Sequence, residues 1–345
     1  MFRLVPSLSV AMATLMLAAP ALAADYGFED EFRPAYPEDW DMSNEGDSLG
    51  FELGVRYWYS WGATNADFGG LTVGVNDQTH SGEVYAKIED DSTSTYVKGY
   101  AGHSFAMGGT YDLAGTTGEV IPGRVAYAVG DFGWLPFGNG ESVQFGGIAG
   151  YQYWNDSPNI GRGDFAIINS SSDITWAAGS PTYSFGGDSA VDNLDIHALR
   201  LGFTAKAELG EFFDIQAEVA AIPYAWISGT LGAQEIAPVI SGNTKTYKSS
   251  ATALNGFGFG AAGEMMVGFH PTENLTIRLG GRAWYLTGQL DASFDTATVT
   301  DPEEVGPPDG VYEIPPSVAT QRFIIASDFA SLFRYGALAE LTWKF

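Results

Sequence analysis

The chain has 345 residues, with 16 basic and 42 acidic side chains and a formal net charge of −26. Such an acidic surface repels nucleic acid, which is excluded as a partner, and would instead attract divalent cations or cationic peptides. The absence of cysteine excludes a disulfide framework and thiolate chemistry.

Residues 1–24 have the pattern of a secretory signal peptide. A basic residue precedes the apolar run Val10–Ala19, and the segment closes on Ala21-Leu22-Ala23, a small-x-small cleavage site. The apolar run is too short for a spanning helix, and no later window offers about twenty consecutive apolar residues. Residues 25–47 are dense in acids and prolines without a sustained period, so we expect an acidic arm, either free or docked as a plug, before a barrel domain at 48–345.

From Leu49 onward, apolar and polar residues alternate in segments typical of β-strands with one apolar face. The segments that we predict as strands are Leu49–Trp61, Gly82–Glu89, Thr93–Ala106, Arg124–Trp134, Val143–Trp154, Leu194–Leu209, Phe213–Ser228, Leu254–Phe269, Leu275–Leu290 and Tyr335–Phe345.

The connections between these strands alternate between long and short. The long ones, which we expect to be loops, are Gly62–Ser81, Met107–Gly123, Asn155–Asp192, Gly229–Ser249 and Asp291–Asp328. Short periplasmic turns and long extracellular loops are typical of outer-membrane barrels, and a soluble barrel has no need for this asymmetry. We therefore predict an all-β fold, a ten-stranded antiparallel transmembrane β-barrel in the cell outer membrane.

The last predicted strand ends on an aromatic residue, Phe345. Closing strands of outer-membrane barrels look like this, and the residue resembles the signal read by the barrel-assembly machinery. We therefore expect Phe345 to be the assembly signal, with that machinery and outer-membrane lipid as partners.

If the apolar faces meet lipid, the opposite faces line the lumen. Residue parity, the alternation of odd and even positions between the two faces of a strand, places twelve charged side chains there. They are Glu52, Arg56, Glu83, Lys87, Arg200, Lys206, Glu208, Glu218, Glu264, Arg278, Arg282 and Glu340. A barrel of about eight strands is filled by side chains, whereas one of about sixteen leaves a water channel. Ten strands with interspersed acids and bases therefore predict a filled or nearly filled lumen, with any site in the outer loops or at the rim beneath them. A general porin is disfavoured, and a narrow pore stays an alternative.

Several strand motifs resemble those of an omptin-like group of alphaproteobacterial outer-membrane proteins. These motifs are Gly54–Trp61, Ser81–Tyr85, Val97–Gly102, Gly150–Trp154, Leu199–Gly202 and Ala220–Tyr224. The resemblance implies omptin-like architecture, ten strands with tall outer loops, and contacts to lipopolysaccharide phosphates. The basic residues that we consider for such contacts are Arg56, Arg162, Lys245 and Lys248.

The resemblance also raises endopeptidase chemistry, because omptins place two aspartates in the second outer loop opposite an Asp-x-His pair in the fourth. Here the second loop offers only Asp112, and the fourth, Gly229–Ser249, has neither His nor Asp. The one Asp-x-His, formed by Asp195 and His197, opens the sixth strand with the parity of lipid-facing residues. A histidine oriented by a carboxylate can act as a general base, so an endopeptidase would have to use Asp112, Asp195 and His197. We predict that the catalytic set does not carry over.

We therefore predict a structural or ligand-binding role through the extracellular loops, without protease activity. An omptin-type aspartyl endopeptidase and a narrow channel are the alternatives. No group of acids has the spacing of a known calcium loop, so we expect no metal site and no cofactor.

Overall fold

The computed structural model describes residues 49–138, 142–177, 180–183, 187–188, 192–232, 237–327 and 329–345. The predicted signal peptide and acidic arm, residues 1–47, lie outside the described residues. Ser48–Phe345 form one compact unit. Within the described part of that unit, no helix is long and apolar enough to cross a membrane.

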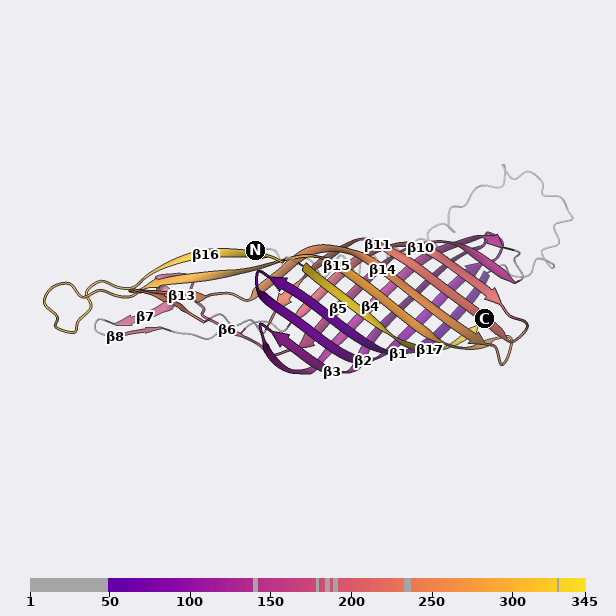
Figure 1. Cartoon of the computed structure of the whole chain (residues 1–345), viewed down its shortest axis with the longest axis horizontal. Helices are drawn as coiled ribbons and strands as arrows, with labels where there is room; N and C mark the ends of the chain where they lie inside the picture. Colours follow the sequence, from indigo (N-terminus) through magenta and orange to yellow (C-terminus); the bar gives the residue numbers. More distant parts are fainter. Residues whose placement is uncertain are drawn as a thin grey trace, which may run out of the picture. The chain divides into compact units, whose positions relative to one another are not determined.

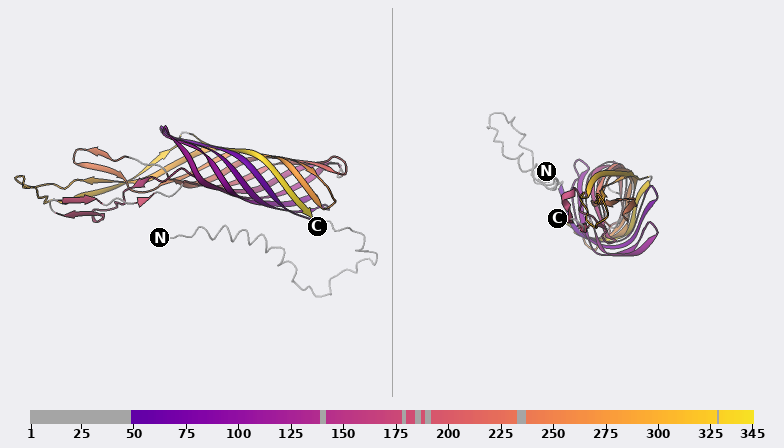
Figure 2. Two further views of the ribbon diagram at one scale, coloured as in Figure 1. Left: turned by 90° about the horizontal axis from the view of Figure 1, so that it is seen from below. Right: turned by 90° about the vertical axis from the view of Figure 1, so that its left-hand side faces the viewer.

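Ten antiparallel strands close into the barrel that the sequence predicts (Figure 1). They are β1 (Leu49–Phe68), β2 (Leu71–Asp90), β3 (Thr95–Leu113), β4 (Thr116–Gly138), β5 (Val143–Asn159), β10 (Asn193–Glu208), β11 (Phe213–Leu231), β14 (Thr252–Phe269), β15 (Leu275–Thr300) and β17 (Phe329–Lys344). Each strand pairs with its neighbours in this order, and β1 pairs with β17 to close the ring. Seen end on, the strands are arranged in a ring (Figure 2). Closure leaves no open sheet edge in the wall.

The two faces of the wall differ as the alternation predicts. On β1, Leu53 and Val55 are 54% and 57% exposed, whereas Glu52, Arg56 and Trp58, at the positions of opposite parity, are buried. Exposed aromatic residues gather near both ends of this apolar band: Tyr57, Tyr151, Trp226 and Tyr335 at one end, and Trp134, Phe137, Phe145 and Trp343 at the other. An apolar band between two aromatic girdles is the surface that outer-membrane barrels turn toward lipid.

Two of the predicted long loops are wrong, because the strands continue through them. β1 and β2 run on to a tight turn at Gly69 and Gly70, both with positive φ, and β3 and β4 do the same at Ala114 and Gly115. The ladder is held by backbone hydrogen bonds, which need no apolar side chain. Beyond the apolar band nothing requires the outer face to be apolar, so the hydrophobic alternation ends before the strand does.

A further sheet projects beyond one end of the barrel (Figures 1 and 2). The end of β15 pairs with β13 (Thr244–Lys248) on one side and β16 (Ser317–Ala326) on the other, and β12 (Val239–Ser241) pairs with β13. The predicted loop Asp291–Asp328 is therefore also strand over much of its length.

The long connection from β5 to β10 lies at the same end of the barrel. It carries the short pairs β6 (Asp164–Phe165) with β9 (Gly187–Asp188) and β7 (Ile174–Ala177) with β8 (Ser180–Tyr183), and one 3₁₀ turn, Ser171–Asp173. A small core joins this connection to the projecting sheet: Ala166, Ile168, Ile174, Tyr247, Ala297 and Val299. The long connections β5–β10, β11–β14 and β15–β17 all lie at this end, together with the tall β1–β2 and β3–β4 hairpins, whereas the opposite end carries short turns. We therefore assign the projecting end as extracellular.

Candidate functional site

The half of the lumen nearer the short turns, which we call the inner half, is filled by ion pairs. Arg278 Nη1 lies 2.6 Å from Glu52 Oε1 and 2.7 Å from Glu340 Oε1, and Arg282 lies 2.7 Å from both Glu83 and Glu264. All twelve charged residues that parity placed inside take part in an ion pair. Removing such charges from water costs several kcal/mol per ion, about what close opposite charges and hydrogen bonds can offset. The predicted filling of the lumen by acids and bases is therefore confirmed in this half.

Aromatic rings pack against the arginines of this network. The guanidinium of Arg56 lies 3.9 Å above the Tyr85 ring, and that of Arg282 lies 4.2 Å above the Tyr100 ring. A cation over an aromatic face is attracted by the ring quadrupole, most strongly where water is excluded. These contacts hold the long arginine side chains across the lumen.

A layer of four aromatic side chains lies next along the lumen. Tyr127 stacks on Trp154 at 4.7 Å, Trp58 meets both edge-on, and Trp284 lies 4.8 Å from Trp154. All four are nearly completely buried. A Cβ on Gly102 would overlap the Tyr127 ring, so glycine is needed there for the ring to lie flat against the wall. This aromatic layer closes the lumen above the charged half.

A second charged group, the Arg334 cluster, lies beside the aromatic layer. Arg334 is completely buried, and its two terminal nitrogens each donate to Asp77 at 2.8 Å in a bidentate pair. Its Nη2 also lies 3.4 Å from Asp156 Oδ2. The second Asp156 oxygen, Oδ1, is buried without a hydrogen-bond partner among the described residues. The cluster therefore holds two carboxylates against one guanidinium.

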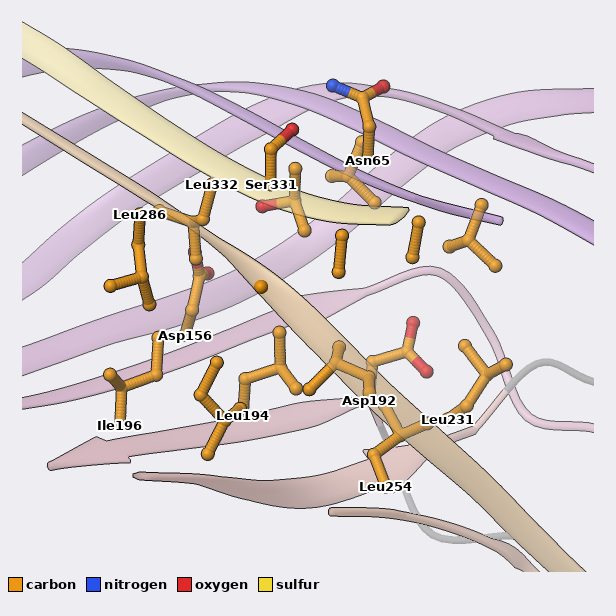
Figure 3. A pocket seen from close by; sticks show the side chains of 18 of the residues that line it. Asn65, Asp156, Asp192, Leu194, Ile196, Leu231, Leu254, Leu286, Ser331 and Leu332 are labelled. Carbon is orange, nitrogen blue, oxygen red and sulfur yellow. The ribbon is translucent and has the colours of Figure 1, made fainter. Parts of the chain in front are cut away.

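Directly beyond the Arg334 cluster, the lumen holds an apolar cavity of about 70 Å³ (Figure 3). Its wall comes from the extracellular ends of eight strands and includes Leu194, Ile196, Leu231, Leu254, Leu286 and Leu332. Asp156 also lines it, and the polar side chains of Asn65 and Ser331 lie on one side. One water needs about 10–15 Å³ of such space. The cavity is therefore large enough for a short hydrocarbon segment.

Sequence reasoning missed both the cavity and the Arg334 cluster. Asp77 and Asp156 stand in segments that we predicted as loops, and Arg334 stands one residue before the predicted closing strand. In each case the available signal was the two-residue period of the neighbouring predicted strand, continued for a few residues past the point where its apolar alternation stops. Extending the pattern would have placed all three side chains inside.

The structure does not bring the hypothetical catalytic residues together. Asp112 is exposed at the tip of the β3–β4 hairpin, where it accepts a hydrogen bond from the Gly115 amide. Asp195 on β10 is paired with Asn155 on β5, which is paired with Ala126 on β4, which in turn is paired with His103 on β3. Asp195 therefore lies in register with His103 rather than with Asp112. The nine residues from His103 to Asp112 span about 30 Å of strand.

Asp195 and His197 instead belong to the outward face of β10. The Asp195 carboxylate accepts hydrogen bonds from Tyr153, Asn155 and Asn193, and the His197 ring stacks on Trp226 at a centroid distance of 5.5 Å. Both side chains thus lie in the extracellular aromatic girdle.

The other predicted contact residues fall in different surroundings. Arg56 was considered for contacts outside the barrel, but this is wrong, because it is buried in the lumen between Glu264 and Glu340. Lys248 is also buried, and only Arg162 among the four is exposed. Phe345 is 71% exposed, and its amide donates to Phe51 O at 2.9 Å, which fastens the chain end to β1. Across the described ranges, no three His, Asp or Glu side chains are placed to hold a metal ion.

No known family profile and no curated protein sequence matches the chain. Among solved structures, the outer membrane protease OmpT from Escherichia coli aligns over 87% of this chain and 97% of its own, with 9% identity and a TM-score of 0.49. The translocator domain of the autotransporter NalP from Neisseria meningitidis aligns over 98% and 96%, with 9% identity and a TM-score of 0.33. A FadL homologue from Pseudomonas aeruginosa aligns over 86% and 90%, with 9% identity and a TM-score of 0.25.

At such low identity and with TM-scores below 0.5, these similarities carry no argument about this chain. The closed antiparallel ring, its apolar outer band and its two aromatic girdles define the class by themselves: the chain has an outer-membrane β-barrel fold. No particular family within that class follows from the similarities.

Proposed function

We propose that this protein lies in the outer membrane and binds small apolar ligands in the cavity at the extracellular end of its lumen. The observation that carries the proposal is the position of that cavity, walled by leucine and isoleucine side chains and backed by the aromatic layer. Ligand sites are typically concave and mostly apolar, with a few polar groups that orient the ligand. The cavity has this composition.

The filled inner lumen favours binding over conduction. The two further voids described below the aromatic layer hold about 40 and 20 Å³, room for only a few waters each. They are lined by paired charges, among them Lys98, Glu218, Glu264 and Arg282. A ligand that enters the cavity from outside would therefore stop at the aromatic layer.

The dispersed acids and histidine favour binding over proteolysis. A general base must lie within hydrogen-bond reach of the groups with which it acts. Asp112 is separated from Asp195 and His197 by much of the height of the wall. We therefore place the ligand-binding role ahead of the endopeptidase.

The expected affinity is modest. Each buried methylene contributes about 0.8 kcal/mol, and a part of that gain is offset by the loss of ligand freedom on binding. We expect a six-carbon ligand to bind with a dissociation constant on the order of 0.1–10 mM, since it would gain only a few kcal/mol.

The test uses the refolded barrel in lipid nanodiscs, with methyl-labelled Ile, Leu and Val, and pentyl methyl ether as an apolar probe. We expect saturable NMR shifts at Ile196 and Leu286, which line the cavity. Ala330→Phe, which fills the cavity from β17, should weaken binding at least tenfold. Ala319→Phe, on the exposed part of β16, is the matched control and should bind like the wild type. Equal binding by Ala330→Phe, or shifts only on the lipid-facing surface, would refute the proposal.

The two alternative functions have their own readouts on the same preparation. Stepwise conductance in planar bilayers would favour the narrow channel. Cleavage of an unstructured cationic peptide that disappears in His197→Ala would favour the endopeptidase. We expect neither, because the lumen is filled and the required side chains lie apart.

A further inference from the structure

The Arg334 cluster gives the apolar cavity a polar end with an unbalanced charge. Asp77 alone forms a bidentate pair with Arg334, and Thr79 Oγ1 also donates to Asp77 at 2.7 Å. Asp156 is the second carboxylate, 2% exposed, and it meets Arg334 with one oxygen only, at 3.4 Å. The positive charge of Arg334 is thus already matched before Asp156 is counted.

The free oxygen of Asp156 is the second observation. Asp156 lines the cavity, and among the described residues no donor meets its buried Oδ1 with hydrogen-bond geometry, although the Trp154 indole interacts with this carboxylate. Leaving a buried acceptor unsatisfied costs about 1–3 kcal/mol, and more for a charged group. Such groups in native proteins are usually satisfied by a water or a ligand. A donor that arrives with the ligand would therefore gain both the hydrogen bond and the charge match.

From this placement we infer that the ligand is an amphiphile, with a short hydrocarbon tail in the cavity and a primary ammonium head that donates to Asp156. This inference rests on the proposed function, because it assumes that the cavity is the binding site. An ammonium has three donors and one positive charge, which balances the surplus carboxylate. A carboxylate head would instead meet two acids in a buried site, which disfavours it.

Other polar groups around the cavity do not supply the same feature. Asp192 also lines it, but its Oδ1 accepts a hydrogen bond from the Gly232 amide. Asn65, Thr230 and Ser331 carry neutral polar side chains. Asp156 is therefore the group on which selectivity for the head should depend.

The experiment compares four probes that share a short alkyl tail: hexylammonium, 1-hexanol, pentyl methyl ether and hexanoate. The ether is an isomer of hexanol that cannot donate a hydrogen bond. We expect affinity to fall in that order, with hexylammonium binding at least tenfold more tightly than the ether and hexanoate binding most weakly. Affinities are read from the methyl shifts of Ile196 and Leu286, at matched ionic strength, with protein-free nanodiscs as the partition baseline.

Two variants assign the preference to its residue. Asp156→Val should lose the tenfold preference for hexylammonium over the ether, and Asp77 keeps Arg334 paired in that variant. Asp192→Asn, the matched carboxylate of the same cavity, should keep the preference. Retention of the preference in Asp156→Val, or its loss in Asp192→Asn, would overturn the assignment to Asp156.

The possible failures remain distinguishable. If no probe shifts the cavity methyls, the proposed function itself fails. If all four probes bind equally at the cavity, the proposed function stands and the head-group inference is wrong.

Discussion

The two halves of the lumen are built by the same alternation of residues and yet have opposite chemistry. In the inner half, inward side chains such as Arg278, Arg282 and Glu340 form close ion pairs. In the outer half, the inward positions of the same strands carry Leu286 on β15 and Leu332 on β17, which face the apolar cavity. One strand therefore contributes to a charged filling at one end and to a cavity wall at the other.

This difference shows which interactions close a lumen and which leave space. Charged side chains are long and reach across the barrel to meet an opposite charge, and the aromatic rings of Trp58 and Trp154 fill what remains. Leucine side chains are shorter and have no distant partner that would hold them across the gap. A ring of them around a wide lumen therefore leaves a void, which suits a ligand that brings its own hydrocarbon.

The largest expected effect concerns the charged half. Arg282→Met removes the cation 2.7 Å from both Glu83 and Glu264. Glu264 keeps Arg56 at 3.6 Å, but the buried Glu83 loses its paired cation, so unfolding free energy should fall by about 3–5 kcal/mol. Denaturant unfolding in detergent, followed by tryptophan fluorescence, measures this. The matched control is Arg322→Met, because Arg322 is 64% exposed and lies 3.7 Å from Asp295, and it should change stability by about 0–1 kcal/mol. Equal losses in both variants would contradict the assigned difference.

A second comparison uses two leucines of one strand. Leu338 is buried among packed side chains and Leu332 borders the cavity. Leu338→Ala should lower unfolding free energy by about 2–5 kcal/mol. Leu332→Ala should cost less, because a residue beside a void loses fewer neighbours. The same unfolding assay decides, and a larger loss for Leu332→Ala would mean that the outer half is as tightly packed as the inner.

A smaller effect on stability is expected from substitutions that add side-chain volume than from those that remove it. Ala330→Phe places a ring where the cavity offers room, so its stability should stay within about 1 kcal/mol of the wild type. Ala225→Phe places the same ring at a completely buried position and should cost about 1–3 kcal/mol by overpacking. Thermal unfolding, read as the loss of compact gel mobility, ranks the two. The opposite order would argue against a real void at the outer end.

The smallest expected effect is a pH dependence at Asp173, which lies in the connection between β5 and β10, outside both halves of the lumen. The Asn169 and Ser170 amides donate to Asp173 Oδ2 at 2.8 and 3.0 Å, and these hydrogen bonds lower the pKa of the Asp173 carboxyl. A lowered folded pKa means that the stabilisation is present above the unfolded pKa and is lost as pH falls through the folded value. NMR titration of the two amides should therefore show a midpoint below that of an unstructured aspartate. A midpoint at or above that of an unstructured aspartate would disprove the lowered pKa of Asp173. The variant Asp173→Asn should abolish the titration of both amides.

Much of the wall could be predicted from local pattern. Strand number, the outward face and the twelve inward charges all follow from the two-residue period, because successive side chains of a strand point to opposite faces. The prediction failed where that period lost its hydrophobic contrast, as in Gly62–Ser81 and Met107–Gly123, which are strand rather than loop. There the backbone ladder alone continues the structure.

The candidate site lay beyond the reach of that pattern. Parity can say that Leu286 and Leu332 point inward, but not that their side chains stop short of each other. It also cannot show that Arg334 on β17 meets Asp77 on β2 and Asp156 on β5, since these residues are 257 and 178 positions apart in sequence. The sequence by itself determined a ten-stranded barrel with a charged interior, because period and charge are local properties. Only the tertiary structure decided which charges pair, which oxygen of Asp156 stays free and where the lumen stays open, because these depend on distances across the closed ring.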